Sequence, residues 1–249
     1  MKSVFYFLGG LLFLVSCQPQ PQISEKQANQ VMKEIKEIPL NYEKVVDGKI
    51  ALTRNFYFIF DQSGSMGEEC SGQKKIDGAK GAISKFMKSV PDDINIGLMA
   101  IGCGSSICEL LPLGTATPAY KKQFEEYIMS MDPNGNTPLV QGIKIAVDRM
   151  VVQKKKQLGY GDYRIIVITD GEATDGYIQE AAVYATQYAM GIYTIGLCID
   201  ESHPLYQFSV KYYDAKDYDQ LQNALKSVTA ETEMFDASTY DSTAYKKTQ

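Results

Sequence analysis

Histidine is almost absent from the sequence: among its 249 residues, only His203 is a histidine. Ser-His-Asp triads, histidine-rich zinc centres and haem attachment sites each require a histidine beside particular partners. The chain also contains no Cys-x-x-Cys pair, which argues against a redox motif or a zinc knuckle. These absences argue against all of these sites, and we expect His203, next to Pro204 in a loop, to be a surface residue.

Nucleotide-binding motifs and an excess of positive charge are missing as well. We find no P-loop and no Gly-x-Gly-x-x-Gly after a predicted strand. The 25 Lys and Arg residues are outnumbered by 30 Asp and Glu, and the net charge of −5 argues against a nucleic-acid partner. With 45% hydrophobic and 22% charged residues, the composition is that of an ordinary globular protein.

The N-terminus has the pattern of an export signal: Lys2, an apolar run from Val4 to Val15, and small residues at its end. The run is too short to cross a bilayer as a helix, which takes ~20 residues. Leu14-Val15-Ser16-Cys17 resembles the lipobox of bacterial lipoproteins, which implies a signal peptide over 1–16 and a lipid (palmitate) anchor on Cys17. Gln18 after the cysteine favours the outer membrane in a Gram-negative cell envelope. A buried N-terminal strand or a short anchor helix is the alternative.

A polar linker with a short helix is predicted over 17–47, a folded domain over 48–230 and a polar tail over 231–249. Within the domain, strands alternate with helices. Strands are expected over 50–60, 94–102, 107–113, 163–169, 192–199 and 208–213, and helices over 76–90, 117–131, 137–152, 177–190 and from 217 onward. This order predicts an α/β fold: a doubly wound, mostly parallel sheet with one antiparallel edge strand and helices on both faces.

Several residues mark helix ends. Thr117-Pro118 and Thr137-Pro138 each predict an N-cap threonine followed by proline at the first helical position. Gly191 is expected just past the end of the helix over 177–190. Asp217 and Gln220 predict a capping box for the last helix.

Oxygen-bearing side chains follow the predicted strands at the edge where ligands bind in such sheets. Asp61, Ser63 and Ser65 come directly after the first strand, and their alternate spacing sends them to one side of an extended backbone. Asp170 ends the strand over 163–169, and Thr137 lies on a Gly-containing turn. Such hard oxygens suit Mg²⁺, with Mn²⁺ or Ca²⁺ as alternatives, whereas softer metals require His or Cys.

The same three segments resemble the von Willebrand factor A (VWA) domain, over roughly residues 50–228. The matching motifs are Asp-x-Ser-x-Ser from Asp61, Gly-Asn-Thr-Pro-Leu around Thr137 and Thr-Asp-Gly-Glu around Asp170. The resemblance implies a Rossmann-like sheet and a metal-ion-dependent adhesion site. Lys211–Ala215 is similar to the family's closing strand.

In that family Ser63, Ser65 and Thr137 would bind the metal directly, and Asp61 and Asp170 often through water. An Asp or Glu of a protein partner would complete the metal's coordination. Taken singly, each motif also has a simpler interpretation, as a polar loop, a helix cap or a turn.

Four cysteines besides Cys17 allow three disulfide connectivities. We expect Cys103–Cys108, which flank the predicted hairpin turn, and by elimination Cys70–Cys198. Cys70 lies in an insertion between Gly67 and Ile76, which also contains Glu68 and Glu69. These glutamates would either repel an acidic partner or add metal ligands.

The sequence therefore predicts a non-enzymatic, envelope-anchored, metal-dependent protein-binding module. One alternative is a structural subunit of an envelope complex with a vestigial metal site. The other is an enzyme in which Asp61 and Asp170 hold a metal for hydrolysis or phosphoryl transfer.

Overall fold

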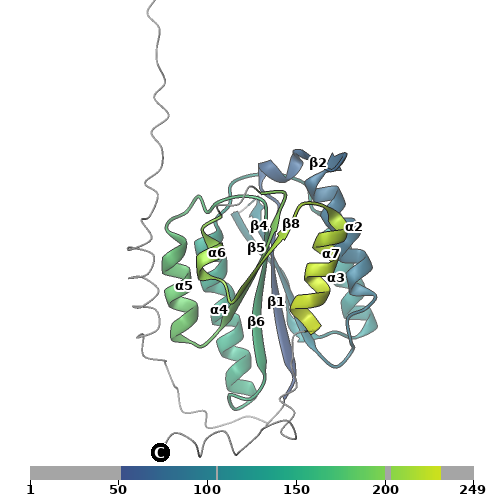
Figure 1. The fold of residues 1–249 in the computed structure, drawn as a ribbon. Helices are drawn as coiled ribbons and strands as arrows, with labels where there is room; N and C mark the ends of the chain where they lie inside the picture. The colour runs from purple at the N-terminus through teal and green to yellow at the C-terminus, as the bar shows by residue number, and fades with distance from the viewer. Residues whose placement is uncertain (1–51, 105, 200–202, 231–249) are drawn as a thin grey trace, which may run out of the picture. The chain divides into compact units, whose positions relative to one another are not determined.

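The computed structural model describes residues 52–104, 106–199 and 203–230 (Figure 1). The predicted signal peptide, Cys17, the linker and the C-terminal tail lie outside these residues. Within the described ranges, no helix combines the length and the hydropathy that a membrane crossing requires.

A six-stranded sheet forms the centre of the fold. Its strands are β1 (Arg54–Asp61), β4 (Asn95–Cys103), β5 (Ser106–Thr115), β6 (Asp162–Thr169), β7 (Gly191–Leu197) and β8 (Lys211–Ala215). Their spatial order is β5-β4-β1-β6-β7-β8, and every neighbouring pair is parallel except β4 and β5. This is the predicted Rossmann-like sheet with one antiparallel edge strand.

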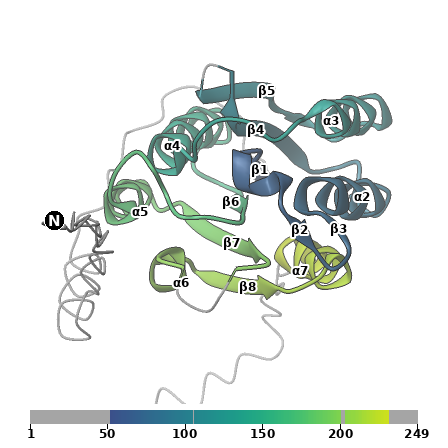
Figure 2. The same ribbon diagram turned by 90° about the horizontal axis from the view of Figure 1, so that it is seen from above.

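Helices cover both faces of the sheet. They are α2 (Lys75–Met87), α3 (Pro118–Ser130), α4 (Leu139–Lys156), α5 (Ile178–Gln187), α6 (Leu205–Phe208) and α7 (Tyr218–Ala230). Figure 2 shows α2, α3 and α7 on one face and α4, α5 and α6 on the other. The sequence did not predict the 3₁₀ helix η1 (Gly64–Gly67) or the small hairpin of β2 (Glu69–Cys70) and β3 (Gln73–Lys74).

The middle of strand β1, from Phe56 to Phe60, is continuously apolar because it contributes to two cores. Phe56, Phe58 and Phe60 face the α2, α3 and α7 side, whereas Tyr57 and Ile59 face the side of α4 and α5. All five are at most 2% exposed. A strand buried on both faces needs no polar alternation, which explains its sequence pattern.

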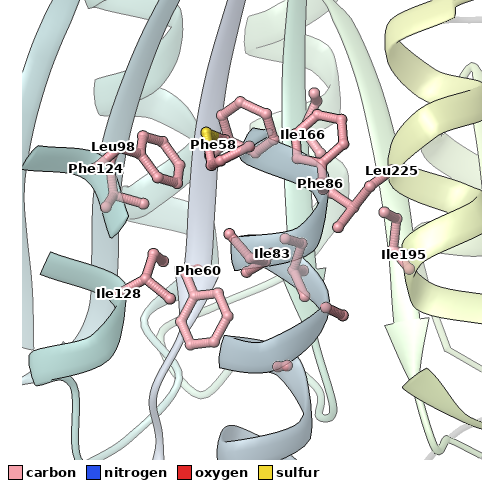
Figure 3. Close-up of a cluster of buried hydrophobic side chains, with 14 of the residues drawn as sticks. Phe58, Phe60, Ile83, Phe86, Leu98, Phe124, Ile128, Ile166, Ile195 and Leu225 are labelled. Atoms are coloured by element: carbon pink, nitrogen blue, oxygen red, sulfur yellow. The ribbon is translucent and has the colours of Figure 1, made fainter. Parts of the chain in front are cut away.

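The first of these cores is built around phenylalanines from the sheet and the helices (Figure 3). The Phe58 ring packs edge-on against Phe124 of α3, with ring centroids 5.3 Å apart, and also contacts Phe86 of α2 at 6.1 Å. Burying each such ring contributes roughly 1.5–3 kcal/mol, so this core stabilises the packing of β1 against the helices.

The order of the strands places β1 beside β6, with Phe60 paired to Ile168. The chain leaves β1 toward β4 and β5 on one side and then crosses back to β6 on the other. Strand order therefore reverses at β1, and the crevice at its carboxyl end is where doubly wound sheets bind ligands.

Two predicted helix starts are confirmed. Thr117 accepts a hydrogen bond from the Tyr120 amide at 3.2 Å, with Pro118 in the first turn of α3. Asp217 accepts from the Gln220 amide at 2.8 Å, and the Gln220 side chain donates back to Asp217 at 3.0 Å.

The predicted end of the helix over 177–190 is wrong. Helix α5 ends at Gln187, and the residue with positive φ is Ala189 (φ 55°), while Gly191 begins β7. A Cβ at Gly191 would lie 3.0 Å from the Tyr193 ring, so the absence of a side chain here leaves room for that ring within the sheet.

The predicted strand over 208–213 is also displaced. Phe208 ends the short helix α6, and β8 begins three residues later, at Lys211.

Candidate metal centre

Asp61 is fully buried at the crevice, with no exposed surface. Its Oδ1 accepts a hydrogen bond from the Ser63 amide at 2.8 Å, and its Oδ2 accepts one from the Thr169 hydroxyl at 2.6 Å. Burial raises the pKa of Asp61 to about 6, although these hydrogen bonds oppose the shift. Ionised Asp61 therefore lacks the stabilisation that a nearby cation would supply.

A chain of hydroxyl groups connects Asp61 to the second carboxylate. The Ser63 and Ser65 hydroxyl oxygens lie 3.1 Å apart, and the Ser65 hydroxyl donates to Asp170 Oδ1 at 2.8 Å. Ser65 lies in η1, so the predicted extended backbone does not hold beyond Ser63; the 3₁₀ turn brings the two hydroxyls together instead. Four of the five predicted residues are thus linked directly.

The loop before α4 packs against the backbone between Asp61 and Ser65. The Asn134 amide donates to the Gln62 carbonyl at 2.7 Å, and the Gly64 amide donates to the Gly135 carbonyl at 3.1 Å. Gly102 lies beneath this contact with φ of +81°, and a Cβ there would come within 2.7 Å of Asn134 O. The close approach of these loops therefore requires glycine at position 102.

Thr137, the fifth predicted residue, is held by the loop that follows Asp170. The Thr137 amide donates to the Thr174 hydroxyl at 3.1 Å, and the Thr174 amide donates to the Thr137 carbonyl at 2.9 Å. Thr137 is 5% exposed. The loops of Thr137 and Asp170 are therefore joined through their backbones.

The prediction that Thr137 caps a helix beginning at Pro138 is wrong. Helix α4 begins at Leu139, and the Asp175 carboxylate accepts hydrogen bonds from the Val140 and Gln141 amides at 3.1 and 2.8 Å. A carboxylate is favoured here because it binds two amides and also interacts with the positive end of the helix dipole. The Thr137 hydroxyl is consequently not used to cap α4. The sequence did not predict the cap by Asp175, because Asp175 lies far from the helix start in the sequence.

Sequence reasoning also missed Lys75, the first residue of α2. Its Nζ donates to Asp170 Oδ2 at 2.8 Å and to Glu68 Oε2 at 3.0 Å. Burial lowers the pKa of Lys75, but hydrogen bonds and attraction to these two carboxylates outweigh it and raise the pKa overall. The available signal was a Lys74-Lys75 pair at the start of a helix, where positive charge is disfavoured.

Both predicted disulfides are present. Cys103–Cys108 closes the turn between β4 and β5, and Cys70–Cys198 ties the β2–β3 hairpin to the end of β7. Tyr218 adds a hydrogen bond to the Cys70 carbonyl at 3.0 Å. The inserted segment is therefore anchored beside the crevice.

His203 is buried, so the expectation of a surface residue is wrong. One ring nitrogen, Nε2, lies 2.7 Å from the Gly171 carbonyl, and Nδ1 accepts from the Leu205 amide at 3.1 Å. Burial lowers the pKa of His203, so the ring is neutral and donates from Nε2. It thereby fastens the loop after β6, next to Asp170, to α6.

The donor set fits a hard cation. The described residues contain no group of three or more His, Cys, Asp or Glu side chains that could hold a metal. The crevice instead links two carboxylates and the hydroxyls of Ser63 and Ser65, and the loop of Thr137 packs beside them; carboxylate and hydroxyl oxygens are ligands of Mg²⁺ and related ions. The buried Asp61 carboxylate, with its pKa raised partly by Asp170, is the structural feature that a bound cation would stabilise.

Comparison with known proteins gives one matching family model, the von Willebrand factor type A domain, over residues 55–245. An uncharacterized Bacillus subtilis protein, YwmD, is 28% identical over 145 residues, which are 54% of this chain and 59% of that protein. The chain thus spans less than two thirds of this relative's length.

Solved structures share the fold. The pilus adhesin SpaC of Lactobacillus rhamnosus GG has a TM-score of 0.59 at 13% identity, over 74% of this chain and 31% of that one. The vWF domain of the type V pili tip protein Mfa5 from Porphyromonas gingivalis has a TM-score of 0.57 at 13% identity, over 73% and 95%.

Proposed function

The chain belongs to the von Willebrand factor type A domain family, and on this premise we propose that it is a divalent-metal-dependent protein-binding module of a cell envelope. Its partner presents an Asp or Glu side chain to the metal. The observation that carries the proposal is the convergence of Asp61, Ser65 and Asp170 at the point where strand order reverses.

In this proposal Mg²⁺ is held by Asp61, Ser63, Ser65, Thr137 and Asp170, with Mn²⁺ or Ca²⁺ as substitutes. The ion supplies a Lewis-acidic position for an incoming carboxylate. The protein's part is to preorganise the oxygens: Thr169 orients Asp61, Ser65 orients Asp170, and Thr174 places Thr137. Hydroxyls are weak donors, so the ion stays electron-poor and attracts an acidic partner.

Three features support a place in the envelope. The lipobox-like segment ending at Cys17 implies a lipid anchor in a membrane, with the outer membrane favoured by Gln18 in Gram-negative cells. The two disulfides suit an oxidising compartment. The relatives of the same fold include a pilus adhesin and a pilus tip protein.

A metal-dependent hydrolase is less well supported. The only histidine of the sequence is His203. Its ring nitrogens are hydrogen-bonded to the Gly171 carbonyl and the Leu205 amide, so His203 does not activate a nucleophile in the described crevice. The described hydroxyls of the crevice that lie beside a carboxylate, Ser65 at Asp170 and Thr169 at Asp61, belong to the proposed metal site, and we propose no catalytic activity.

Calorimetric titration with Mg²⁺ and Mn²⁺ tests the metal site. Asp61→Ala should weaken binding by at least roughly 100-fold, since it removes a buried carboxylate ligand. Thr137→Ala should weaken binding by roughly tenfold. Thr117→Ala is the matched control, because Thr117 also precedes a proline at a helix start but lies outside the site. Equal affinity in wild type and Asp61→Ala would contradict the assignment.

Pull-down from an envelope extract, with Mg²⁺ or with EDTA, tests the interaction itself. A binding module should retain its partner with Mg²⁺ and lose it in EDTA and in the Asp61→Ala variant. Retention that is the same under all three conditions would favour the structural subunit with a vestigial site.

A further inference from the structure

Lys75 occupies a position where a lysine is locally unfavourable. It is the first residue of α2, where the positive end of the helix dipole repels a cation. Its side chain is only 9% exposed, and burial adds a desolvation cost. A residue that is unfavourable for two local reasons is expected either to be stabilised by contacts with its surroundings or to have a functional role.

The surroundings are the carboxylates of the candidate metal site. Nζ of Lys75 lies 2.8 Å from Asp170 Oδ2, and the side chain of Asp170 has no exposed surface. The second contact, to Glu68 Oε2 at 3.0 Å, involves a glutamate that is 68% exposed. The main partner of Lys75 is therefore Asp170, and the Ser65 hydroxyl binds the other oxygen of that carboxylate.

The inserted hairpin holds Lys75 in this orientation. The Lys75 amide donates to the Glu68 carbonyl at 2.9 Å, which closes the segment containing β2 and β3. The Cys70–Cys198 disulfide anchors the same segment to the end of β7. This backbone hydrogen bond and this disulfide together hold the inserted segment, and with it the Lys75 ammonium group, in position.

Charge counting at the crevice shows what Lys75 does. Asp61 and Asp170 carry two negative charges, and Lys75 places one positive charge on Asp170. Without a metal, this charge stabilises a carboxylate that would otherwise be buried and uncompensated. With a metal, a monovalent and a divalent cation share Asp170, and their repulsion in a partly desolvated site is substantial.

We propose that Lys75 is a built-in counter-cation of the metal site: it neutralises Asp170 in the metal-free protein and thereby lowers the affinity of the site for divalent cations. The inference rests on the proposed function, because the competing metal binds beside Asp170. The inference assigns to Lys75 a role in setting the concentration of free divalent cation at which the module binds its metal.

The experiment titrates the full chain with Mg²⁺ by calorimetry and follows thermal unfolding in EDTA and in Mg²⁺. Lys75→Met removes the charge and keeps the length of the side chain. We expect roughly tenfold or greater tightening of Mg²⁺ binding, a lower Tm in EDTA and a larger rise of Tm with Mg²⁺ than in wild type.

The controls separate charge from packing. Lys75→Arg keeps the charge, so Mg²⁺ affinity should stay within about threefold of wild type. Lys144→Met removes a lysine from an exposed pair with Glu180 on the other face of the sheet, and it should change neither quantity. If Lys75→Met does not fold without metal, Lys75→Gln provides a neutral side chain that can still donate to Asp170.

The outcomes for the two proposals are distinguishable. Unchanged or weaker Mg²⁺ binding in the neutral Lys75 variants overturns the role of Lys75, while loss of binding in Asp61→Ala still supports the metal site. Binding in Lys75→Met but not in wild type supports the counter-cation and overturns metal dependence in the native protein. Absence of Mg²⁺ binding from every variant overturns both.

Discussion

The two ends of the sheet both contain buried polar groups, but these groups are compensated to different degrees. At the amino end, Asn55 of β1 and Asn95 of β4 are paired in register, and the Asn95 amide group donates to Asn55 Oδ1 at 2.9 Å. The Asn55 amide group in turn donates to the Thr53 carbonyl at 2.8 Å and the Asp162 carbonyl at 3.1 Å. The two asparagines are neutral and form these hydrogen bonds within the protein, and the buried charge at this end, Arg164 of β6, is paired with Asp162 at 2.8 Å.

At the carboxyl end of the same strand, the buried groups are ionisable and incompletely compensated. Asp61 accepts hydrogen bonds from the Thr169 hydroxyl and the Ser63 amide, which are uncharged donors, and burial raises its pKa to about 6. Lys75 compensates Asp170 but makes no such contact with Asp61. Perturbed ionisable groups gathered in one crevice are typical of functional sites. The comparison indicates that the amino end contributes stability, whereas the carboxyl end gives up stability for binding.

Asn55→Ala should produce the largest loss of stability. It removes the donors to Thr53 and Asp162 and leaves the Asn95 amide group without its acceptor, which should cost about 3 kcal/mol of unfolding free energy. Denaturant unfolding in EDTA measures the loss. Mg²⁺ affinity should be unchanged, and a change of more than about threefold would show that the two ends are coupled.

Asp61→Asn should act in the opposite direction on stability. Asparagine removes a buried charge while its amide can still pair with the Thr169 hydroxyl, so the metal-free protein should gain roughly 1–3 kcal/mol at pH 7. Mg²⁺ binding should be lost in the same variant. If the unfolding free energy of metal-free Asp61→Asn were lower than that of metal-free wild type, this result would contradict the proposed trade-off between stability and binding.

The gain from Asp61→Asn should depend on pH. Because the folded-state pKa of Asp61 lies near 6, above the ordinary value of 3.8, the folded wild type binds more protons than the unfolded chain between these values. Wild-type stability therefore rises, relative to the variant, as pH falls through 6. The difference in unfolding free energy between the two proteins, measured in EDTA from pH 7 to 4, should shrink toward zero. A difference that is constant with pH would contradict the raised pKa.

The two Thr-Pro helix starts provide the smallest expected effect. Thr117→Ala should cost about 1 kcal/mol, because its hydroxyl caps α3. Thr137→Ala should cost less than about 0.5 kcal/mol, because Asp175 caps α4 instead. Thermal unfolding of the metal-free variants compares them, and equal losses would assign a capping role to Thr137 as well.

Patterns within single segments predicted much of this molecule. The apolar residues of β1 indicated a strand buried on both faces, and the alternation of strands and helices predicted the parallel sheet. Asp61 and Asp170 each follow a predicted strand, which places them in one crevice if the two strands are adjacent, and β1 does lie beside β6. The Cys103–Cys108 disulfide followed from a hairpin turn of only a few residues.

The errors at the candidate site concern side chains whose partners lie far away in sequence, whereas those in the fold are displaced element ends and short elements that were not predicted. Lys75 binds Asp170, 95 residues away, and Asp175 caps a helix that begins about 35 residues earlier. His203, expected at the surface, is buried against Gly171, 32 residues before it. Hydrophobic periodicity and local motifs do not predict these contacts, since each contact depends on how loops that follow different strands meet at the edge of the sheet.

The sequence alone therefore determined the elements, the fold class and the residue types of the candidate metal site, because hydrophobic patterns and loop motifs act over a few residues. The tertiary structure decided which of those residues are buried, capped or paired. Only in the folded chain does Asp61 lose its water, Asp170 acquire Lys75 and Thr137 lose its role as a cap. The physical reason is that desolvation and charge pairing depend on the distances between side chains in space. These distances are set only when the chain folds around the sheet.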